Sequence, residues 1–411
     1  MFRFSFDIDD AEDSGFGPVV GPDTAPAQTE QGQLENSYTV AEHSASQVSL
    51  DDLLSSLPHT ISFSPLSISR PSGHDVVLSR RDLFDARFQL ISADHGAGME
   101  TRPSEVEFID APSDLVPGVY EGGLKTWECS LDLVACLSSI YGSQIAKALQ
   151  RKRILELGCG TAAPSLYLIH SIFSAEPSTD ARVQVHLQDY NELVLRLVTL
   201  PNIILSWYMS PASSKYRSSS PAGGSESNDD DEPAPLPPAD LSQPGELALT
   251  PELKTAFLES LQAHGIHLKL FSGSWSTFDV ERAGGPYDVL LTSETIYRTA
   301  SLGSLVDLMR RATAPTTQAG SSASLEDSAS RLSLSDSEDL KVLAGAPYLC
   351  LVAAKLVYFG VGGGANEFIE AVENSTAGLG PGGERSSSQV QTVWETNKGV
   401  KRSIMRVVWG P

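Results

Sequence analysis

The sequence is poor in cysteine and in basic residues, and it has no long apolar run. Its four cysteines show no Cys-x-x-Cys spacing and no grouping with histidine, so neither a metal site nor a disulfide framework is expected. No apolar stretch reaches membrane-spanning length, and the first residues lack a signal-peptide pattern. These absences predict a soluble, intracellular chain with reduced thiols and no membrane association.

The basic residues are outnumbered, with 29 Lys and Arg against 52 Asp and Glu and a net charge of −23. Residues 1–60, 210–250 and 313–346 carry −18 of that charge and are rich in Ser, Pro and Gly. Solvated acidic tails and loops are the commoner reason for such segments, and attraction of a basic partner is the alternative. We expect disorder in residues 1–56 and in two insertions, 210–250 and 313–346, and no direct nucleic-acid binding.

Between the acidic segments the apolar pattern alternates between strand and helix. Residues 57–117 hold short apolar runs and are predicted to form a β-rich cap before a larger domain at 118–411. Strands are predicted at 153–157, 183–188, 267–271, 287–292, 348–355, 390–395 and 402–409. Helices are predicted at 163–174, 192–200, 251–264, 302–311 and 365–373. This order predicts an α/β, Rossmann-like sheet of five parallel strands and a C-terminal antiparallel hairpin, with helices on both faces.

The most informative stretch follows the first of these strands. Glu156 precedes Gly158 and Gly160, and a helical pattern begins directly afterwards. A strand, a tight glycine turn and a helix start allow backbone to approach a nucleotide-like ligand closely. Glu156 would repel a pyrophosphate but attract a ligand with an ammonium group, which favours S-adenosylmethionine over a dinucleotide. The dinucleotide site and an ordinary strand-to-helix turn stay open as alternatives.

Polar and aromatic residues follow the next strands. Asp189 ends the second strand, where an acid can accept both ribose hydroxyls, although a helix N-cap shared with Asn191 is the alternative. Trp275, after Gly273 and Ser274, could stack on an adenine or lie in the core. Polar residues at 293–297 end the fourth strand, where a reactive methyl group would lie.

Taken together, six segments resemble one family. They are Gly-Leu-Lys-Thr-Trp-Glu-Cys-Ser (123–130), Leu-Glu-Leu-Gly-Cys-Gly (155–160), Gln-Asp-Tyr-Asn (188–191), Ser-Gly-Ser-Trp (272–275), Ser-Glu-Thr-Ile-Tyr (293–297) and Lys-Leu-Val-Tyr-Phe-Gly-Val-Gly-Gly-Gly (355–364). They resemble the protein-histidine N-methyltransferases, which belong to the seven-β-strand S-adenosylmethionine-dependent enzymes. The start, Phe-Arg-Phe-Ser-Phe (2–6), is also similar to that family. The long acidic insertions depart from it.

The resemblance implies methylation of one histidine in a basic large-subunit ribosomal protein, in cytoplasm and nucleus, by an enzyme that we expect to be a monomer. It also implies a set of residues that contact S-adenosylmethionine: Thr126, Trp127, Glu128, Cys129, Ser130, Gly158, Asp189, Tyr190, Asn191, Gly273, Ser274, Trp275 and Ser293. Glu156 and Gly160 join this set from the glycine-turn reasoning.

A histidine acceptor needs little help from a base, because an imidazole of pKa about 6.5 is mostly neutral at cellular pH, whereas a lysine of pKa about 10.4 must be deprotonated. Glu294 and Tyr297 are the candidate catalytic residues, as groups that orient the imidazole. A lysine methyltransferase of the same fold, a non-catalytic ribosome-associated module and a dinucleotide-dependent oxidoreductase are the competing hypotheses.

Overall fold

The computed structural model describes residues 43–71, 73–94, 123–219, 236–313, 337–358, 363–375, 388–397 and 399–410. The chain divides into two units, Met1–Val40 and Ala41–Pro411, and every described residue belongs to the second.

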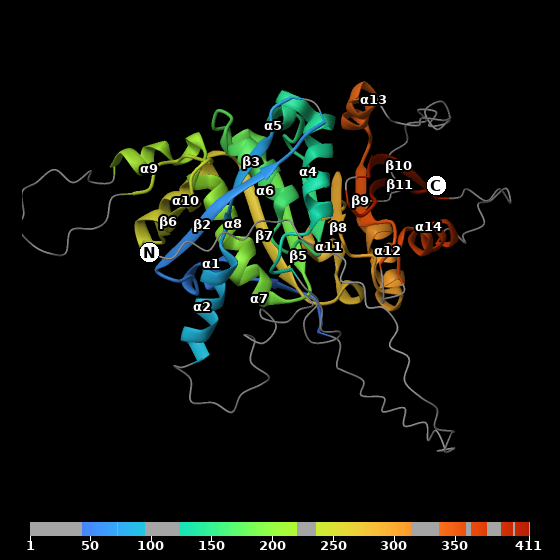
Figure 1. Ribbon diagram of the computed structural model, residues 1–411, viewed down its shortest axis with the longest axis horizontal. Helices are drawn as coiled ribbons and strands as arrows, with labels where there is room; N and C mark the ends of the chain where they lie inside the picture. Colours follow the sequence, from blue (N-terminus) through green and yellow to red (C-terminus); the bar gives the residue numbers. More distant parts are fainter. Residues whose placement is uncertain are drawn as a thin grey trace, which may run out of the picture. The chain divides into compact units, whose positions relative to one another are not determined.

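An eight-stranded sheet forms the centre of this unit (Figure 1). Its order is β1-β7-β5-β4-β8-β9-β11-β10. The bounds are β1 Ser46–Val48, β4 Arg153–Leu157, β5 Val183–Asp189, β7 Ile266–Ser272, β8 Val289–Ser293, β9 Leu349–Lys355, β10 Gln389–Thr396 and β11 Arg402–Val408. Strands β7, β5, β4, β8 and β9 are mutually parallel, while β1, β11 and β10 pair antiparallel to their neighbours.

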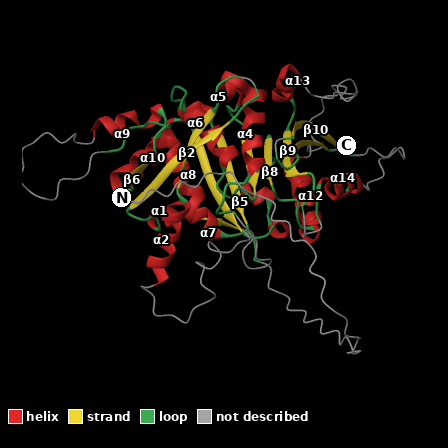
Figure 2. Cartoon of the chain, viewed as in Figure 1, coloured by secondary structure: helices red, strands yellow, loops and turns green. Residues whose placement is uncertain are grey.

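Helices cover both faces of the sheet (Figure 2). Their bounds are α1 Leu50–Ser55, α2 Leu83–Asp94, α4 Glu128–Tyr141, α5 Ile145–Ala148, α6 Ala163–Phe173, α7 Glu192–Val194, α8 Leu200–Tyr208, α9 Ser214–Ser219, α10 Pro251–Ala263, α11 Val280–Ala283, α12 Thr299–Thr313, α13 Ser337–Val342 and α14 Ala365–Asn374. One apolar core lies between the sheet and α4, α6, α8 and α10, and a second lies between the sheet and α11, α12 and α14.

Strand β4 shows how the alternation of side chains along a strand places the site. Ile154 packs into the first core, whereas Leu155 and Leu157 pack into the second. Glu156 therefore points to the same face as Ile154, toward α6. Because all five parallel strands run the same way, the loops that follow their carboxyl ends meet at one edge of the sheet.

The predicted fold class is confirmed, with one addition. All seven predicted strands are present, within two residues of their expected bounds. The eighth strand, β1, pairs with β7 and was not predicted. Residues 43–56, expected in a disordered tail, instead form β1 and α1. Ser49 caps α1 by accepting a hydrogen bond from the Asp52 backbone N–H. The rest of the expected tail, residues 1–42, lies outside the described residues.

The expected β-rich cap is part of a small second sheet. Its three strands are β3 Val76–Arg81, β2 Thr60–Ile68 and β6 Gly245–Ala248, in that order, and both pairings are antiparallel. Strand β6 comes from the segment expected to be a disordered insertion, and Leu247 is fully buried there. The sheet shares the first core with the central sheet, so it is not a separate layer of its own. Residues 95–117, 220–235 and 314–336 lie outside the described residues.

The helix predicted at 192–200 is longer than expected. It runs from α7 through a π-helical turn at Leu195–Thr199 into α8, past Pro201. A proline lacks a backbone N–H and crowds the carbonyl one turn earlier. The wider π turn relieves this crowding because it spaces the helical hydrogen bonds further apart at that point. The helix continues past Pro201 because the backbone widens locally at this turn.

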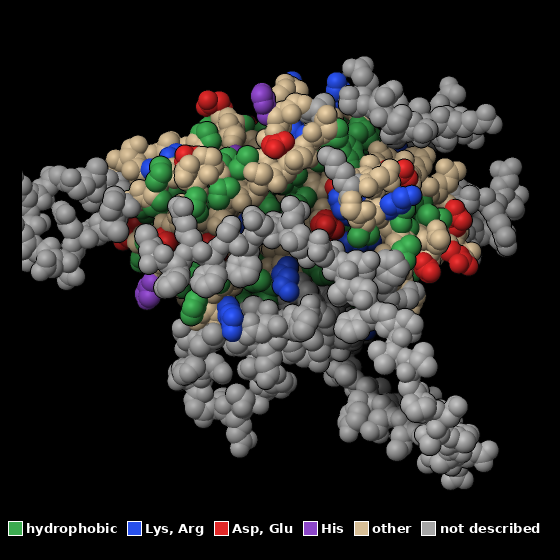
Figure 3. Space-filling view, viewed as in Figure 1, with side chains coloured by type: hydrophobic (Ala, Val, Ile, Leu, Met, Phe, Trp, Pro, Cys, Tyr) green, Lys and Arg blue, Asp and Glu red, His purple; other side chains and the backbone are tan. Residues whose placement is uncertain are grey.

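The described residues carry little of the net negative charge, because their 28 acidic residues are nearly balanced by 24 basic ones. In the face drawn in Figure 3, acidic side chains gather over α14, which carries the exposed Glu367, Glu370 and Glu373, and are scattered elsewhere. Within the described ranges no single helix is long and apolar enough to cross a membrane. One pair bent by 77°, Glu192–Tyr208 with Pro211–Ser219, meets those criteria together.

Candidate active site

The glycine turn after β4 has the tight geometry expected of it. Gly158 has φ +59° and Gly160 has φ +52°, and a side chain at either position would be strained. A Cβ atom on Gly158 would lie 2.6 Å from Cγ2 of Thr295, and one on Gly160 would lie 3.1 Å from the carbonyl oxygen of Gly123. The backbone of this turn is therefore packed against two other loops of the same edge.

Gln188 connects the loops after β4 and β7, and it was not among the predicted site residues. Its Oε1 accepts hydrogen bonds from Trp275 Nε1 at 2.8 Å and from the Gly158 backbone N–H at 3.3 Å. Its Nε2 donates to the Gly273 carbonyl at 2.7 Å. A buried polar side chain must find such partners, so a glutamine near the end of an apolar strand was the available signal. One side chain thus holds the loops after β4 and β7 together.

Of the two residues considered as the cap of α7, Asn191 takes that role and Asp189 does not. The Asn191 side chain caps α7 by accepting a hydrogen bond from the Leu193 N–H at 3.0 Å. Asp189 does not cap that helix; its Oδ2 accepts from the Gly160 N–H at 2.9 Å. The carboxylate thus lies against the glycine turn, where a ribose ligand is expected. Tyr190, between them, lies edge-on to the ring of His43, 6.3 Å away.

Glu156 does not occupy the place expected of it. Its side chain is only 2% exposed, and Oε2 accepts hydrogen bonds from the Ser165 backbone N–H at 3.0 Å and from the Ser165 hydroxyl. Burial raises the pKa of Glu156 to about 8, so the group is mostly protonated at neutral pH. The expectation that Glu156 attracts an ammonium group is therefore wrong in this structure, because strand alternation turns the carboxyl under the turn to fasten the start of α6.

The loop Gly273–Trp275 is held from two sides. The Ser274 N–H donates to the His43 carbonyl at 2.8 Å, and a Cβ on Gly273, at φ +107°, would lie 2.5 Å from the Ser44 carbonyl oxygen. The segment that leads into β1 therefore lies directly on this loop. Trp275 is partly buried, with its indole N–H bonded to Gln188, so its ring is fixed beside the glycine turn.

The segment Thr126–Ser130 leads into α4 at the same edge. Thr126 Oγ1 lies 3.0 Å from the Thr161 hydroxyl and accepts from Arg80 Nη1 at 3.0 Å, which ties it to the glycine turn and to β3. Ser130 donates to the Trp127 carbonyl at 2.6 Å, closing the first turn of α4, and Cys129 is fully buried. This places Trp127 and Glu128 where α4 begins, facing the ends of β8 and β9.

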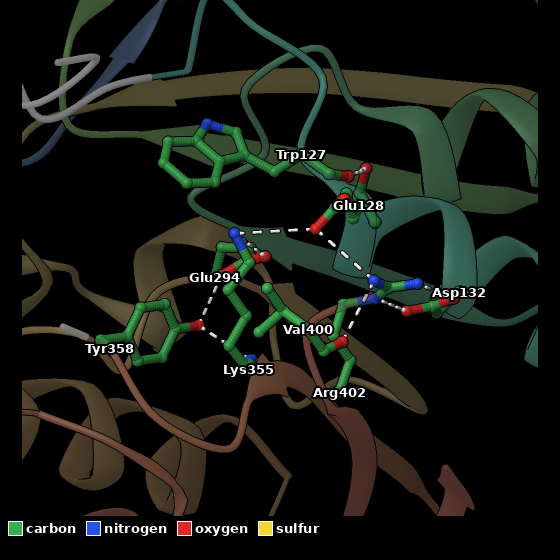
Figure 4. Close-up of polar contacts among 9 residues, drawn as sticks. Trp127, Glu128, Asp132, Glu294, Lys355, Tyr358, Val400 and Arg402 are labelled. Carbon is green, nitrogen blue, oxygen red and sulfur yellow. Dashed lines mark hydrogen bonds and ion pairs between the residues drawn. The ribbon is translucent and has the colours of Figure 1, made fainter. Parts of the chain in front are cut away.

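A charged cluster lies there, with Glu294 at its centre (Figure 4). Glu294 follows β8 with φ +56°, an uncommon conformation for a residue other than glycine. Its Oε2 accepts from the Tyr358 hydroxyl at 2.6 Å, and its Oε1 lies 3.9 Å from Lys355 Nζ. Glu128 Oε2 lies 3.7 Å from the same ammonium. Burial, and then the carboxylate, raise the pKa values of Tyr358 and of Cys129, so both neighbours stay protonated.

The remaining predicted residues lie around this cluster. Tyr297 is partly buried, and its ring centre is 6.4 Å from that of Tyr358. Ser293 is the last residue of β8 and pairs with Ala353 of β9. The structure therefore brings Glu294 and Tyr297 to one site, across from the glycine turn. Part of the predicted glycine run, residues 359–362, lies outside the described residues.

No protein-family model matches the chain. Its curated relatives include Histidine protein methyltransferase 1 of Saccharomyces cerevisiae, 31% identical over 336 residues that make up 80% of this chain and 75% of the relative. The protein of the same name in Schizosaccharomyces pombe is 29% identical over 79% of this chain and 82% of the relative. A Histidine protein methyltransferase 1 homolog in Rattus norvegicus is 28% identical over 72% of this chain and 59% of the relative.

Among solved structures, the mitomycin 7-O-methyltransferase MmcR is similar over 68% of this chain and 57% of its own, with 10% identity and a TM-score of 0.27. That similarity is too low to support the fold or the site, which depend on the strand order and the contacts above.

Proposed function

The chain belongs to the histidine protein methyltransferase family, and from this premise we propose that it methylates a histidine of a large-subunit ribosomal protein with S-adenosylmethionine. The observation that carries the proposal is the meeting of two sites at one sheet edge. A backbone cradle made by Gly158, Gly160 and the loop Gly273–Trp275 lies beside the cluster around Glu294.

The cradle fits the methyl donor. Gly158 and Gly160 both have positive φ, which lets the chain turn tightly after β4 and present backbone to a nucleoside, while Thr295 and Gly123 pack behind the turn. Asp189 would hold the ribose hydroxyls and Trp275 would contact the adenine, with Thr126–Ser130 on the opposite side. S-adenosylmethionine supplies an electrophilic methyl group: a ring nitrogen forms the N–C bond while the C–S bond breaks, its electron pair stays on sulfur, and the methylated ring loses its N–H proton to water.

The chain itself contributes position more than acid–base chemistry. Alignment of two bound reactants can supply roughly 7–11 kcal/mol of a barrier. A neutral imidazole already carries a nucleophilic lone pair. Glu294 and Tyr297 orient that ring, since the carboxylate can accept its N–H and the Tyr297 ring lies 6.4 Å from the ring of Tyr358, whose hydroxyl donates to the same carboxylate.

Charge and family resemblance support the ribosomal substrate. Ribosomal proteins are basic because they bind RNA, and a chain of net charge −23 attracts them at long range. For such a substrate we propose that the enzyme acts as a monomer, in the cytoplasm and the nucleus.

The proposal is tested by incubating the full chain with methyl-labelled S-adenosylmethionine and, separately, large-subunit and small-subunit ribosomal proteins. We expect label in one large-subunit protein, located by mass spectrometry on a histidine. Asp189→Ala serves as the matched inactive control, with Asp180→Ala, on an exposed turn away from the sheet edge, as the active one. Label on lysine would support the lysine methyltransferase instead, and binding without transfer would support a non-catalytic module.

A further inference from the structure

Lys355, the last residue of β9, carries a half-enclosed ammonium group beside the proposed acceptor site (Figure 4). Its side chain is 20% exposed. Nζ lies 3.9 Å from Glu294 Oε1, 3.7 Å from Glu128 Oε2 and 5.0 Å from the ring centre of Trp127. These distances are too long for direct hydrogen bonds, so the ammonium acts on the site mainly through its charge.

Glu294 has one oxygen in use and one available. Oε2 accepts from Tyr358, whereas the buried Oε1 has no N–H or O–H donor among the described residues, and the Cys129 thiol beside the carboxylate is only a weak donor. A buried carboxylate oxygen without a donor is costly, and a ligand that brings an N–H removes that cost. The acceptor imidazole has one N–H in its neutral form, so Oε1 can bind it and leave the other ring nitrogen for the methyl group.

Glu294 on its own would make the acceptor imidazole a poorer nucleophile. A carboxylate next to an imidazole favours the imidazolium and raises its pKa, as an opposite charge within 4–6 Å does. The imidazolium has no lone pair and cannot accept a methyl group. A second charge of opposite sign near the carboxylate is needed to cancel this effect.

We propose that Lys355 supplies that charge: it is a positioning and specificity residue that keeps the acceptor imidazole neutral beside Glu294. The inference rests on the proposed function. The same ammonium repels a protonated lysine side chain, which favours histidine over lysine as the acceptor.

Among the described residues, the other charged groups around Glu294 do not take over this role. Glu128 is 57% exposed, so solvent screens it. Arg402 is engaged by Asp132, with Nε 2.6 Å from Oδ2, and this hydrogen bond raises the pKa of Arg402. On α4 the buried Cys129 stays protonated, as does Tyr358 after β9. Lys355 is therefore the cation that balances Glu294.

The test compares Lys355→Met, which keeps length and removes charge, with Lys355→Arg, which keeps charge. The single-turnover rate of methyl transfer to large-subunit ribosomal protein is measured between pH 5.5 and 9, because it reports the protonation state in the bound complex. For Lys355→Met we expect the acidic limb to move up by about one pH unit, so that the rate far below the limb falls about tenfold. The rate at pH 9 should change little, and Lys355→Arg should restore the limb.

Glu294→Gln should shift the acidic limb in the opposite direction, to lower pH, because it removes the charge that favours the imidazolium. This shift should be seen even though the maximal rate falls. Calorimetry with S-adenosylmethionine should give similar affinities for wild type and Lys355→Met. An equal loss at every pH together with weakened donor binding would overturn the proposal and make Lys355 a ligand of the donor. No methylhistidine from wild-type protein would instead refute the proposed function itself.

Discussion

Replacing Gln188 by leucine tests the cofactor cradle most sharply, because one side chain holds the loops after β4 and β7. The change leaves the Gly273 carbonyl, the Trp275 indole N–H and the Gly158 N–H without their partner. Each buried polar group left unpaired costs about 1–3 kcal/mol. The Gly158 contact is long at 3.3 Å and Trp275 is partly exposed, so the total is about 2–4 kcal/mol rather than the sum of three full penalties.

Much of that cost should fall on donor binding, because the three groups belong to the loops that we propose contact the donor. Since 1.4 kcal/mol is tenfold in affinity, we expect at least about a tenfold weaker Kd for S-adenosylmethionine by isothermal titration calorimetry. Gln184→Leu is the matched control, as it removes a glutamine from the same strand at its opposite end. If Gln188→Leu bound the donor as tightly as Gln184→Leu, the loops after β4 and β7 would not form the donor site.

Three further predictions concern the same edge. Gly160 has φ +52° and lies against backbone, so Gly160→Ala should weaken donor binding at least about tenfold, measured by calorimetry. Gly303 lies inside α12 with open space around it, so Gly303→Ala should instead stabilise the fold by about 0.5–1 kcal/mol, measured by thermal unfolding. Because the folded-state pKa of Glu156 is raised to about 8, the free energy of unfolding of the wild type should decline as pH rises from about 4.5 through 8. Urea titrations should show a smaller decline for Glu156→Gln. An identical dependence of stability on pH in the two proteins would contradict the burial of Glu156. Deletion of residues 1–48 should weaken donor binding more than deletion of 1–42, because it also removes β1 from the edge of β7 and His43 and Ser44 from the Gly273–Trp275 loop. Equal affinities, measured by calorimetry, would show that this segment is dispensable.

The larger elements could be predicted because their apolar periodicity is strong. Strand β4 was predicted with its observed bounds, since Arg153–Leu157 is an apolar run ended by glycine. Strand β1 was missed because Ser46–Val48 has a single buried residue, Val48, and exists only by pairing with the edge of β7. Strand β6 was missed for the same reason, as Gly245–Ala248 depends on β2.

Within the site, residue types could be predicted more readily than partners. The glycine turn, Asp189 and Trp275 were placed correctly at the sheet edge by their positions after parallel strands. Glu156 was misassigned because sequence shows a charge but not that the side chain faces α6. Lys355 was noted only as the start of the family-like segment 355–364 and was given no role. Its proposed role depends on Glu294, which is distant in sequence and lies near it because strands β8 and β9 are neighbours.

The central claim is that this chain transfers methyl groups to histidine. The most direct measurement is amino-acid analysis of a protein acceptor after reaction with the full chain and methyl-labelled S-adenosylmethionine. The label should elute as methylhistidine, with one S-adenosylhomocysteine released for each methyl group transferred. Label eluting as methyllysine, or no label transferred by a chain that binds the donor, would contradict the account.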